Sequence, residues 1–318
     1  MTAQALHEWL KVEREAVRKG INAARRAVWW FIATIVVSEI AILWLGNSID
    51  FQLALVMALF QGIILVVFLG IAHQRKLALT DFRTKSNVRR VRQGELQEIS
   101  QYLRALMLKL NLNDKDLVLY RQLTLHSTPA IKASHSEIAI LVPVGFISIF
   151  ARNPDAGKAM LAHELAHVVQ HDASLWVFVG SYGNSFKNCA LIFGTLNLIG
   201  MGAEAAYSHK VPNVPMGVVL MSVYIAEYEK AVHARRRSEY IADFTAAACV
   251  GPNAIYDAIL QYVESDGVGA GGFDDELMRN AAGFGNMLHP PKAWRLSRIK
   301  AYAPLINQNP EVKAENAT

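Results

Sequence analysis

Cysteine and charge are both scarce in this chain of 318 residues. Its two cysteines, Cys189 and Cys249, lack the paired spacing of a disulfide framework, which excludes such a scaffold and disfavours a thiolate zinc site. Charged residues make up 19% of the sequence and hydrophobic residues 53%, a balance that favours a membrane protein over a soluble enzyme. The length allows one large domain or two modest ones.

The basic residues behind the net charge of +5 cluster beside apolar segments, so nucleic acid is not an expected partner. Residues 1–26 predict a basic amphipathic helix. Residues 27–45 carry one charge, Glu39, and residues 53–72 carry none. Since about 20 apolar residues in a helix cross a ~30 Å hydrocarbon core, the sequence predicts a transmembrane helix hairpin at 27–72, in contact with the lipid bilayer.

The distribution of positive charge predicts how this hairpin is oriented. Seven basic residues lie from Arg75 to Arg92, directly after the second apolar segment, whereas the turn between the segments carries only Asp50. Because cytoplasmic loops retain positive charge, both ends of the hairpin are expected in the cytoplasm. The sequence therefore predicts a multi-pass protein of the cell inner (cytoplasmic) membrane, with the rest of the chain facing the cytoplasm.

Beyond the hairpin, the sequence predicts a mainly α fold with a small β-sheet, an α+β class. Apolar spacing predicts a helix over 94–112. Residues rich in Ile, Val and Phe predict strands over 117–125 and 137–150, the second broken at Pro143–Gly145. The residues between these strands, 126–136, predict a loop. An exposed edge strand of such a sheet suits binding of an extended peptide.

A further helix is predicted to begin at Asn153, a candidate N-cap, with Pro154 in its first turn, and to extend to about Asp172. Residues 175–226 are apolar but interrupted, and predict either a second membrane hairpin or helices buried in the domain. The remaining segments predict helices over 227–250 and 253–264, a glycine-rich lid or linker at 266–272, a final helix from His289 and a disordered tail at 306–318.

The decapeptide Leu161–Gln170 contains the pattern His-Glu-x-x-His, in which His163 and His167 lie one turn apart on the same face of a helix. Two imidazoles so placed can both bind one Zn²⁺ ion. Glu164 can reach a water molecule on that ion without being a ligand itself. The decapeptide therefore predicts the centre of a zinc metallopeptidase.

A catalytic zinc site usually has a third protein ligand. The candidates in this sequence are His171, Glu204, Glu227, Glu229 and Glu239. His171 lies about 12 Å along the helix axis from His163, so one ion on a straight helix cannot bind both. Glu239 is favoured because Asp243 follows one turn later on the same face. One carboxylate can then bind zinc while the other accepts a proton from a ligand histidine.

Three segments, Leu161–Asp172, Arg236–Asp243 and His289–Arg295, resemble the signatures of HtpX-type integral-membrane zinc metallopeptidases. This gluzincin family also includes the prenyl-protein CAAX proteases, and its pattern is His-Glu-x-x-His, Glu-x-x-x-Asp and His-Pro-Pro ahead of an arginine. The resemblance covers roughly residues 95–300. It implies a membrane-anchored gluzincin-type domain with one Zn²⁺ ion.

Residue by residue, the resemblance implies that His163, His167 and Glu239 bind zinc and that Glu164 is the general base and acid. It implies that Asp243 supports a ligand histidine. His289 and Arg295 match residues that line the site, where a cationic side chain can stabilise an oxyanion.

The chain departs from the family at Ala133–Glu137, where relatives have an Asn-Ala-containing segment before the edge strand. His126 and His135 are candidates for the substrate-binding loop there, with a structural role as the alternative. His171 is expected to be a supporting or helix-end residue.

We therefore expect a membrane-bound zinc endopeptidase that hydrolyses polypeptide substrates, membrane proteins among them, in membrane protein quality control. Its metallopeptidase domain is predicted over 94–305, with the possible hairpin 175–226 inside it. One alternative is a CAAX-type protease, which usually needs more spans. Another is a non-catalytic membrane sensor or scaffold with a zinc site. A third is a small transporter that uses Lys187 and Glu39 as intramembrane polar groups.

Overall fold

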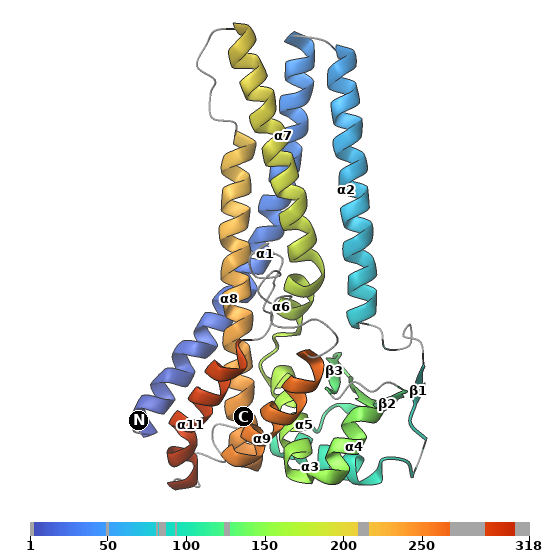
Figure 1. The fold of residues 1–318 in the computed structure, drawn as a ribbon, viewed down its shortest axis with the longest axis vertical. Coiled ribbons are helices and arrows are strands. Elements are labelled where there is room, and N and C mark those ends of the chain that lie inside the picture. The colour runs from blue at the N-terminus through green and yellow to red at the C-terminus, as the bar shows by residue number, and fades with distance from the viewer. Residues whose placement is uncertain are drawn as a thin grey trace. The chain divides into compact units, whose positions relative to one another are not determined.

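The computed structural model describes residues 3–48, 51–80, 82, 87–92, 94–123, 128–208, 216–267 and 290–308. The fold is mostly helical with one small mixed sheet (Figure 1), which confirms the predicted α+β class. The chain divides into two compact units. The first, named the sheet unit, comprises Met1–Arg18, Thr80–Ser174 and Arg235–Thr318; the second, the helical unit, comprises Lys19–Leu79 and Leu175–Ala234.

The sheet has four strands in the order β1-β2-β4-β3. They are β1 (Val88–Arg90), β2 (Asp116–Gln122), β3 (Ala130–Ala133) and β4 (Glu137–Pro143). The central pair β2 and β4 is parallel, whereas β1 and β3 are antiparallel to their neighbours. Alternate residues of β4 supply different apolar clusters: Ile138 and Ile140 join the main core, and Ala139 and Leu141 join a smaller one. Strand β4 is therefore covered on both faces, as period-two alternation requires.

The main core lies between the sheet and its helices. These helices are α3 (Gln97–Lys109), α4 (Val144–Arg152), α5 (Pro154–Val169), α9 (Pro252–Gly267) and α11 (Lys292–Gln308). Leu103, Ile140, Leu165 and Ile259, each fully or almost fully buried, bring together a strand and three of these helices. The start of α1 (Ala3–Ser48) also joins this core through Leu10.

Two predictions about this unit are wrong. Residues 144–150 form helix α4 rather than a strand, because Phe146 and Phe150, one turn apart, both fill the core with ring centroids 5.9 Å apart. The predicted loop 126–136 contains strand β3 within its described part. In contrast, the start of α5 is as predicted: the Asn153 side chain accepts a hydrogen bond from the amide of Ala156 at 3.2 Å.

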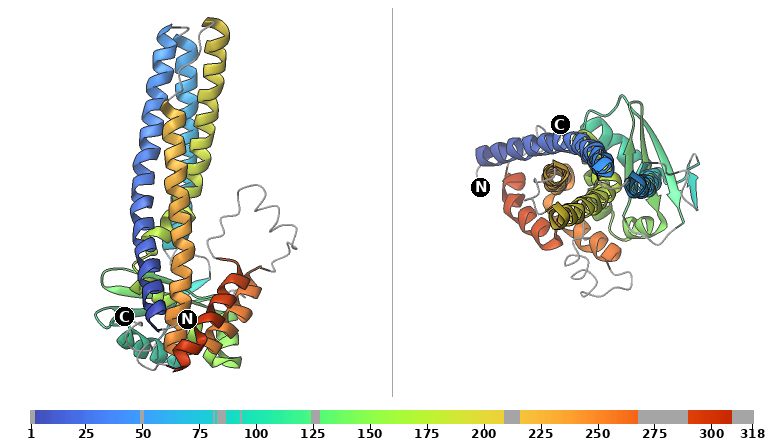
Figure 2. Two further views of the ribbon diagram at one scale, coloured as in Figure 1. Left: turned by 90° about the vertical axis from the view of Figure 1, so that its left-hand side faces the viewer. Right: turned by 90° about the horizontal axis from the view of Figure 1, so that it is seen from above.

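The helical unit contains long helices that run beside one another (Figure 2). They comprise α1 from Lys19 onward, α2 (Phe51–Thr80), α6 (Ala173–Val177) from Leu175, the π-helical turn η2 (Phe178–Gly183), α7 (Asn184–Ser208) and α8 (Met216–Val250) up to Ala234. Phe31 of α1 stacks on Phe186 of α7 at 4.1 Å between ring centroids. A Cβ at Gly20 would collide with Ala234, so α1 and α8 cross there in close contact.

Within the described ranges, no helix combines the length and the apolar character that crossing a membrane requires. The described residues of the predicted hairpin at 27–72 and of the possible hairpin at 175–226 are helical, but membrane crossing is not confirmed for either. Most of the predicted lid or linker at 266–272 lies outside the described residues. The predicted disordered tail at 306–318 is wrong for its first three residues, which end α11 because Ile306 is fully buried in the core; the rest of that tail lies outside the described residues.

Candidate metal centre

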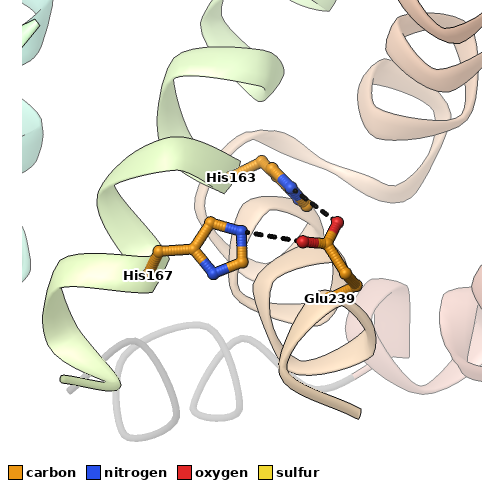
Figure 3. A group of neighbouring side chains, drawn as sticks. All are labelled: His163, His167 and Glu239. Atoms are coloured by element: carbon orange, nitrogen blue, oxygen red, sulfur yellow. Dashed lines mark ion pairs between the residues drawn. The ribbon is translucent and has the colours of Figure 1, made fainter. Parts of the chain in front are cut away.

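His163 and His167 project from α5 toward Glu239 of α8 (Figure 3). Nε2 of His163 lies 3.4 Å from Oε2 of Glu239, and Nε2 of His167 lies 3.3 Å from Oε1. Their side chains are 3%, 11% and 0% exposed, in the order His163, His167, Glu239. In the part of the chain that is described, these residues form the one group of His, Cys, Asp or Glu side chains arranged to hold a metal ion, with all three ligand atoms within 4.8 Å.

The donor set of this group fits zinc. Catalytic Zn²⁺ sites commonly use two imidazole nitrogens and one carboxylate oxygen at about 2.0–2.2 Å. Two donors at such distances with tetrahedral angles lie roughly 3.3–3.5 Å apart. Each of the two nitrogen–oxygen separations falls in this range, 3.4 Å from His163 to Oε2 of Glu239 and 3.3 Å from His167 to Oε1.

The second ring nitrogen of each histidine faces a carboxylate. Nδ1 of His163 lies 3.0 Å from Oδ1 of Asp243, and Nδ1 of His167 lies 2.9 Å from Oδ2 of Asp172. A carboxylate in this position keeps the proton on Nδ1 and leaves Nε2 available to a metal ion. The predicted support of a ligand histidine by Asp243 is consistent with this placement, whereas Asp172 was not predicted as a site residue.

Asp172 reaches His167 because the chain turns sharply after α5. The helix ends at Val169, and His171 adopts a left-handed conformation with φ 53°. Asp172 follows this turn and is 1% exposed, while His171 is exposed and lies outside the metal group. A carboxylate just beyond the end of a His-Glu-x-x-His helix is the sequence signal that points to Asp172.

Two buried arginines border the centre. Arg295 donates from Nε and Nη2 to the two oxygens of Asp243 at 2.8 and 2.6 Å, and its Nη1 lies 3.7 Å from Oε2 of Glu239. Arg235 places Nη2 at 2.5 Å from Oε1 of Glu239 and Nη1 at 3.7 Å from Asp172. Both arginines are 3% exposed. The guanidinium of Arg295 faces Asp243 in the interior, and this contact does not test the stabilisation of an oxyanion. The role of Arg295 in stabilising an oxyanion therefore stays a prediction.

The charges of the centre shift the pKa values of its members. Burial raises the pKa of Asp243 and of Asp172, but Arg295 beside the first and His167 beside the second outweigh burial and bring both pKa values below the ordinary range. Burial lowers the pKa of His167, yet Asp172 and Glu239 together raise it to about 10. Because an imidazole must be deprotonated at the nitrogen that binds a metal ion, metal binding by His167 competes with protons.

The remaining predicted residues lie outside the group of three candidate metal ligands. Glu164 is half-buried on α5. Glu227 and Glu229, the alternative third ligands, belong to the helical unit, where they pair with Lys230 and Lys187 at 2.8 and 3.1 Å. The side chain of Glu204 is not described, and His126 and His289 lie outside the described residues.

His135 is exposed in the turn between β3 and β4, where its carbonyl accepts a hydrogen bond from Lys115 at 2.7 Å. That contact involves the backbone, so it does not assign a role to the imidazole.

Comparison with known proteins supports the zinc assignment independently of this geometry. The sequence profile of peptidase family M48 matches residues 95–303, well over half of the chain, and this range contains every residue of the metal centre. A comparison with curated protein sequences finds no match. Members of family M48 are zinc enzymes. The chain therefore belongs to peptidase family M48 and is a zinc metallopeptidase, a hydrolase that acts on peptide bonds.

Proposed function

We propose that the protein is an HtpX-type endopeptidase that holds one Zn²⁺ ion through His163, His167 and Glu239. The observation that carries this proposal is the convergence of both Nε2 atoms on the two oxygens of Glu239, with each Nδ1 held by its own carboxylate. When bound, the zinc ion supplies a Lewis acid that polarises a carbonyl group and activates water.

Glu164 is the proposed general base and acid. It follows His163 on α5 and remains half-buried, whereas its neighbours Ala162 and Leu165 are fully buried in the core. Its carboxylate is outside the metal group, so it can accept a proton from the attacking water and donate it to the leaving amine.

Strand β3 is the proposed docking edge for the substrate. It lies at one end of the strand order, antiparallel to β4, and its four residues are all half-buried. Strand β3 also contacts α5, the helix that carries both histidines. An extended polypeptide can add to this edge through main-chain hydrogen bonds, which suits cleavage within chains of varied sequence.

We also propose that the helical unit lies in the cytoplasmic membrane, with the metal centre facing the cytoplasm and membrane proteins in quality control among its substrates. Apolar side chains are exposed along α2, including Leu59, Ile63 and Val66, while the polar Gln61 of the same helix is 1% exposed. This distribution is the reverse of that on a helix that faces water. A large exposed apolar surface supports contact with lipid acyl chains.

The substitution Glu164→Gln tests the chemistry. The amide is isosteric but cannot take a proton, so cleavage of casein by the purified full chain should fall by about 10²–10⁴-fold while zinc per chain stays at the wild-type value. Zinc is counted by plasma mass spectrometry. The mechanism is wrong if the variant retains zinc and cleaves at the wild-type rate.

Labelling of single cysteines tests the membrane location. Cys189 and Cys249 are first replaced by alanine, and a cysteine is then placed at Glu8, which is exposed, or at one position within Glu204–Lys210. A membrane-impermeant maleimide should leave the cysteine at position 8 unlabelled in intact cells and label it once the cells are opened. Labelling of position 8 in intact cells would overturn the cytoplasmic location. Labelling within Glu204–Lys210 in intact cells would mean that α7 and α8, the later pair of helices, also cross the membrane.

A further inference from the structure

Each histidine of the centre contacts an aspartate, and each aspartate in turn lies beside an arginine. In the first series, Nδ1 of His163 lies beside Asp243, which forms an ion pair with Arg295. In the second series, Nδ1 of His167 lies beside Asp172, and Arg235 is the neighbouring arginine. The arginines of both series also lie beside Glu239. Arg295 lies 3.7 Å from its Oε2, and Arg235 lies 2.5 Å from its Oε1.

We propose that Asp172 and Arg235 form a positioning pair for the zinc ligands, equivalent in role to Asp243 and Arg295. Asp172 orients His167, and Arg235 holds Glu239 in the conformation that faces the two histidines. This proposal rests on the zinc site proposed above and adds two residues to it. Neither residue contacts the reacting groups, so both act through the ligands.

Arg235 is fixed by three contacts at once. It lies one turn before Glu239 on α8, and its Nη1 donates to the hydroxyl of Ser238 at 2.7 Å. The same nitrogen lies 3.7 Å from Asp172, beyond the end of α5. A guanidinium that is 3% exposed is stable only when it is paired. Arg235 therefore ties the segment after α5 to the helix that supplies the third ligand.

The backbone before Asp172 supports the same conclusion. Left-handed φ values are uncommon for residues other than glycine because the side chain crowds the backbone. His171 adopts such a conformation at φ 53°. This turn brings the carboxylate of Asp172 back to a ring five residues earlier. The contact with His167 thus depends on a specific backbone arrangement rather than on regular helix geometry.

The arginines also offset part of the negative charge around the ligands. Glu239, Asp172 and Asp243 are three buried carboxylates, and Arg235 and Arg295 are the two buried cations beside them. Groups that orient and polarise metal ligands typically change metal affinity by about 10–100-fold when they are removed. We expect that range for Asp172 and Arg235.

The test measures zinc affinity of the purified full chain by competition with a chromophoric chelator. Asp172→Asn and Arg235→Gln should each raise the dissociation constant by about 10–100-fold, and the double variant should change it by less than the product of the single effects. Arg235→Lys should restore only part of the affinity, because lysine cannot donate to two carboxylates as a fork. Matched controls are Asp155→Asn on α5 and Arg152→Gln on α4, both exposed residues, which should bind zinc as wild type.

A second measurement separates positioning from folding. In the cobalt-substituted chain, Asp172→Asn and Arg235→Gln should change the visible d–d absorption of the metal, while the thermal midpoint identifies any variant that has lost its fold. If Arg235→Gln does not fold, the positioning role is judged from the isosteric variant Asp172→Asn alone. Wild-type zinc affinity and a wild-type cobalt spectrum in folded Asp172→Asn would overturn the proposal.

His163→Ala distinguishes this outcome from failure of the zinc site itself. If His163→Ala loses zinc and Asp172→Asn and Arg235→Gln do not change affinity, the positioning role fails and the zinc site stands. If His163→Ala binds zinc as wild type, the proposed zinc site fails and the positioning role with it.

Discussion

The sheet unit and the helical unit differ in where they place apolar and polar side chains. Among the described residues, all but four of the exposed large apolar side chains lie in the helical unit, the exceptions being Val12, Leu108, Leu123 and Trp294. The sheet unit instead buries charged residues around its metal centre and pairs them with one another. Exposed large apolar side chains are therefore concentrated in the helical unit, the distribution on which the proposed membrane location rests.

The buried polar residues of the helical unit show the same contrast with its exposed apolar surface. In the helical unit, Thr34, Ser38 and Gln61 are each at most 1% exposed, although their helices present apolar side chains outward. Helices in lipid commonly bury polar groups against one another in this way. The comparison supports the proposal that the two units have different surroundings, and each of the following experiments tests one of the two units.

Removal of a metal ligand should have the largest effect and should affect only the sheet unit. Glu239→Ala removes the carboxylate that both histidines face, so zinc binding and casein cleavage should fall to background, whereas the membrane-bound fraction should not change. Zinc per chain, cleavage and fractionation of membranes measure the three properties. Treatment of the wild type with a chelator should reproduce the loss, and added Zn²⁺ should restore cleavage. Retention of zinc by Glu239→Ala would contradict this prediction.

Two phenylalanines offer a matched test of packing in the two units. Phe146 is 0% exposed in the core of the sheet unit, and Phe60 is 54% exposed in the helical unit. Phe146→Ala should destabilise the chain by about 3–5 kcal/mol because it leaves a cavity. Phe60→Ala should change stability in detergent by less than about 1 kcal/mol. Thermal unfolding followed by tryptophan fluorescence measures both, and equal losses would mean that Phe60 is also a core residue.

With the helical unit in a membrane, as proposed, charge on the outward face of α2 should weaken membrane association. Leu59→Arg and Ile63→Arg each place a cation where an apolar side chain is 60% or 62% exposed, at a cost of up to about 2.5–3.5 kcal/mol if the position lies at the centre of the bilayer. The fraction of the protein that stays in membranes after carbonate extraction should fall. Leu108→Arg is the control, since Leu108 is 66% exposed in the sheet unit. A similar loss in all three variants would mean that extraction does not report on α2.

A smaller effect is expected where α1 joins the sheet unit. Glu13 is 5% exposed and lies 3.3 Å from Arg237 of α8 and 3.5 Å from Arg298 of α11. Glu13→Gln keeps the size of the side chain but weakens both contacts, which should destabilise the unit by about 1–3 kcal/mol. Glu15→Gln, whose partner Arg18 is exposed, should unfold at the wild-type temperature. The two variants unfolding at one temperature would show that the Glu13 contacts add no stability.

Local patterns were sufficient to predict much of the fold near the metal centre. The Asn153 cap, the helix that carries His163 and His167, and the placement of Glu239 one turn before Asp243 all follow from spacing within a few residues. The segment 144–150 misled prediction because its Ile, Val and Phe side chains favour strands in isolation, while burial of Phe146 and Phe150 on one face selects a helix. Here tertiary packing outweighs local propensity.

The supporting residues of the centre were harder to predict because their role depends on long-range contacts. Arg235 belongs to a run of three arginines that resembles a solvated basic segment, and only the folded chain buries it against Glu239. Arg295 donates to the two oxygens of Asp243 across a sequence separation of 52 residues, a contact that local patterns do not reveal. Strand β3 has four residues and an alternation too short to separate from a loop.

The order of the metal-centre residues along the chain has a consequence for synthesis. His163, His167 and Asp172 precede the segment Leu175–Ala234 of the helical unit, and Arg235, Glu239 and Asp243 follow it. A nascent chain that has not yet reached residue 239 therefore carries His-Glu-x-x-His without its third ligand. With Glu239 as the third ligand, as proposed, the zinc site forms only after the intervening helices have been made, so an unfinished chain is expected to be an inactive peptidase.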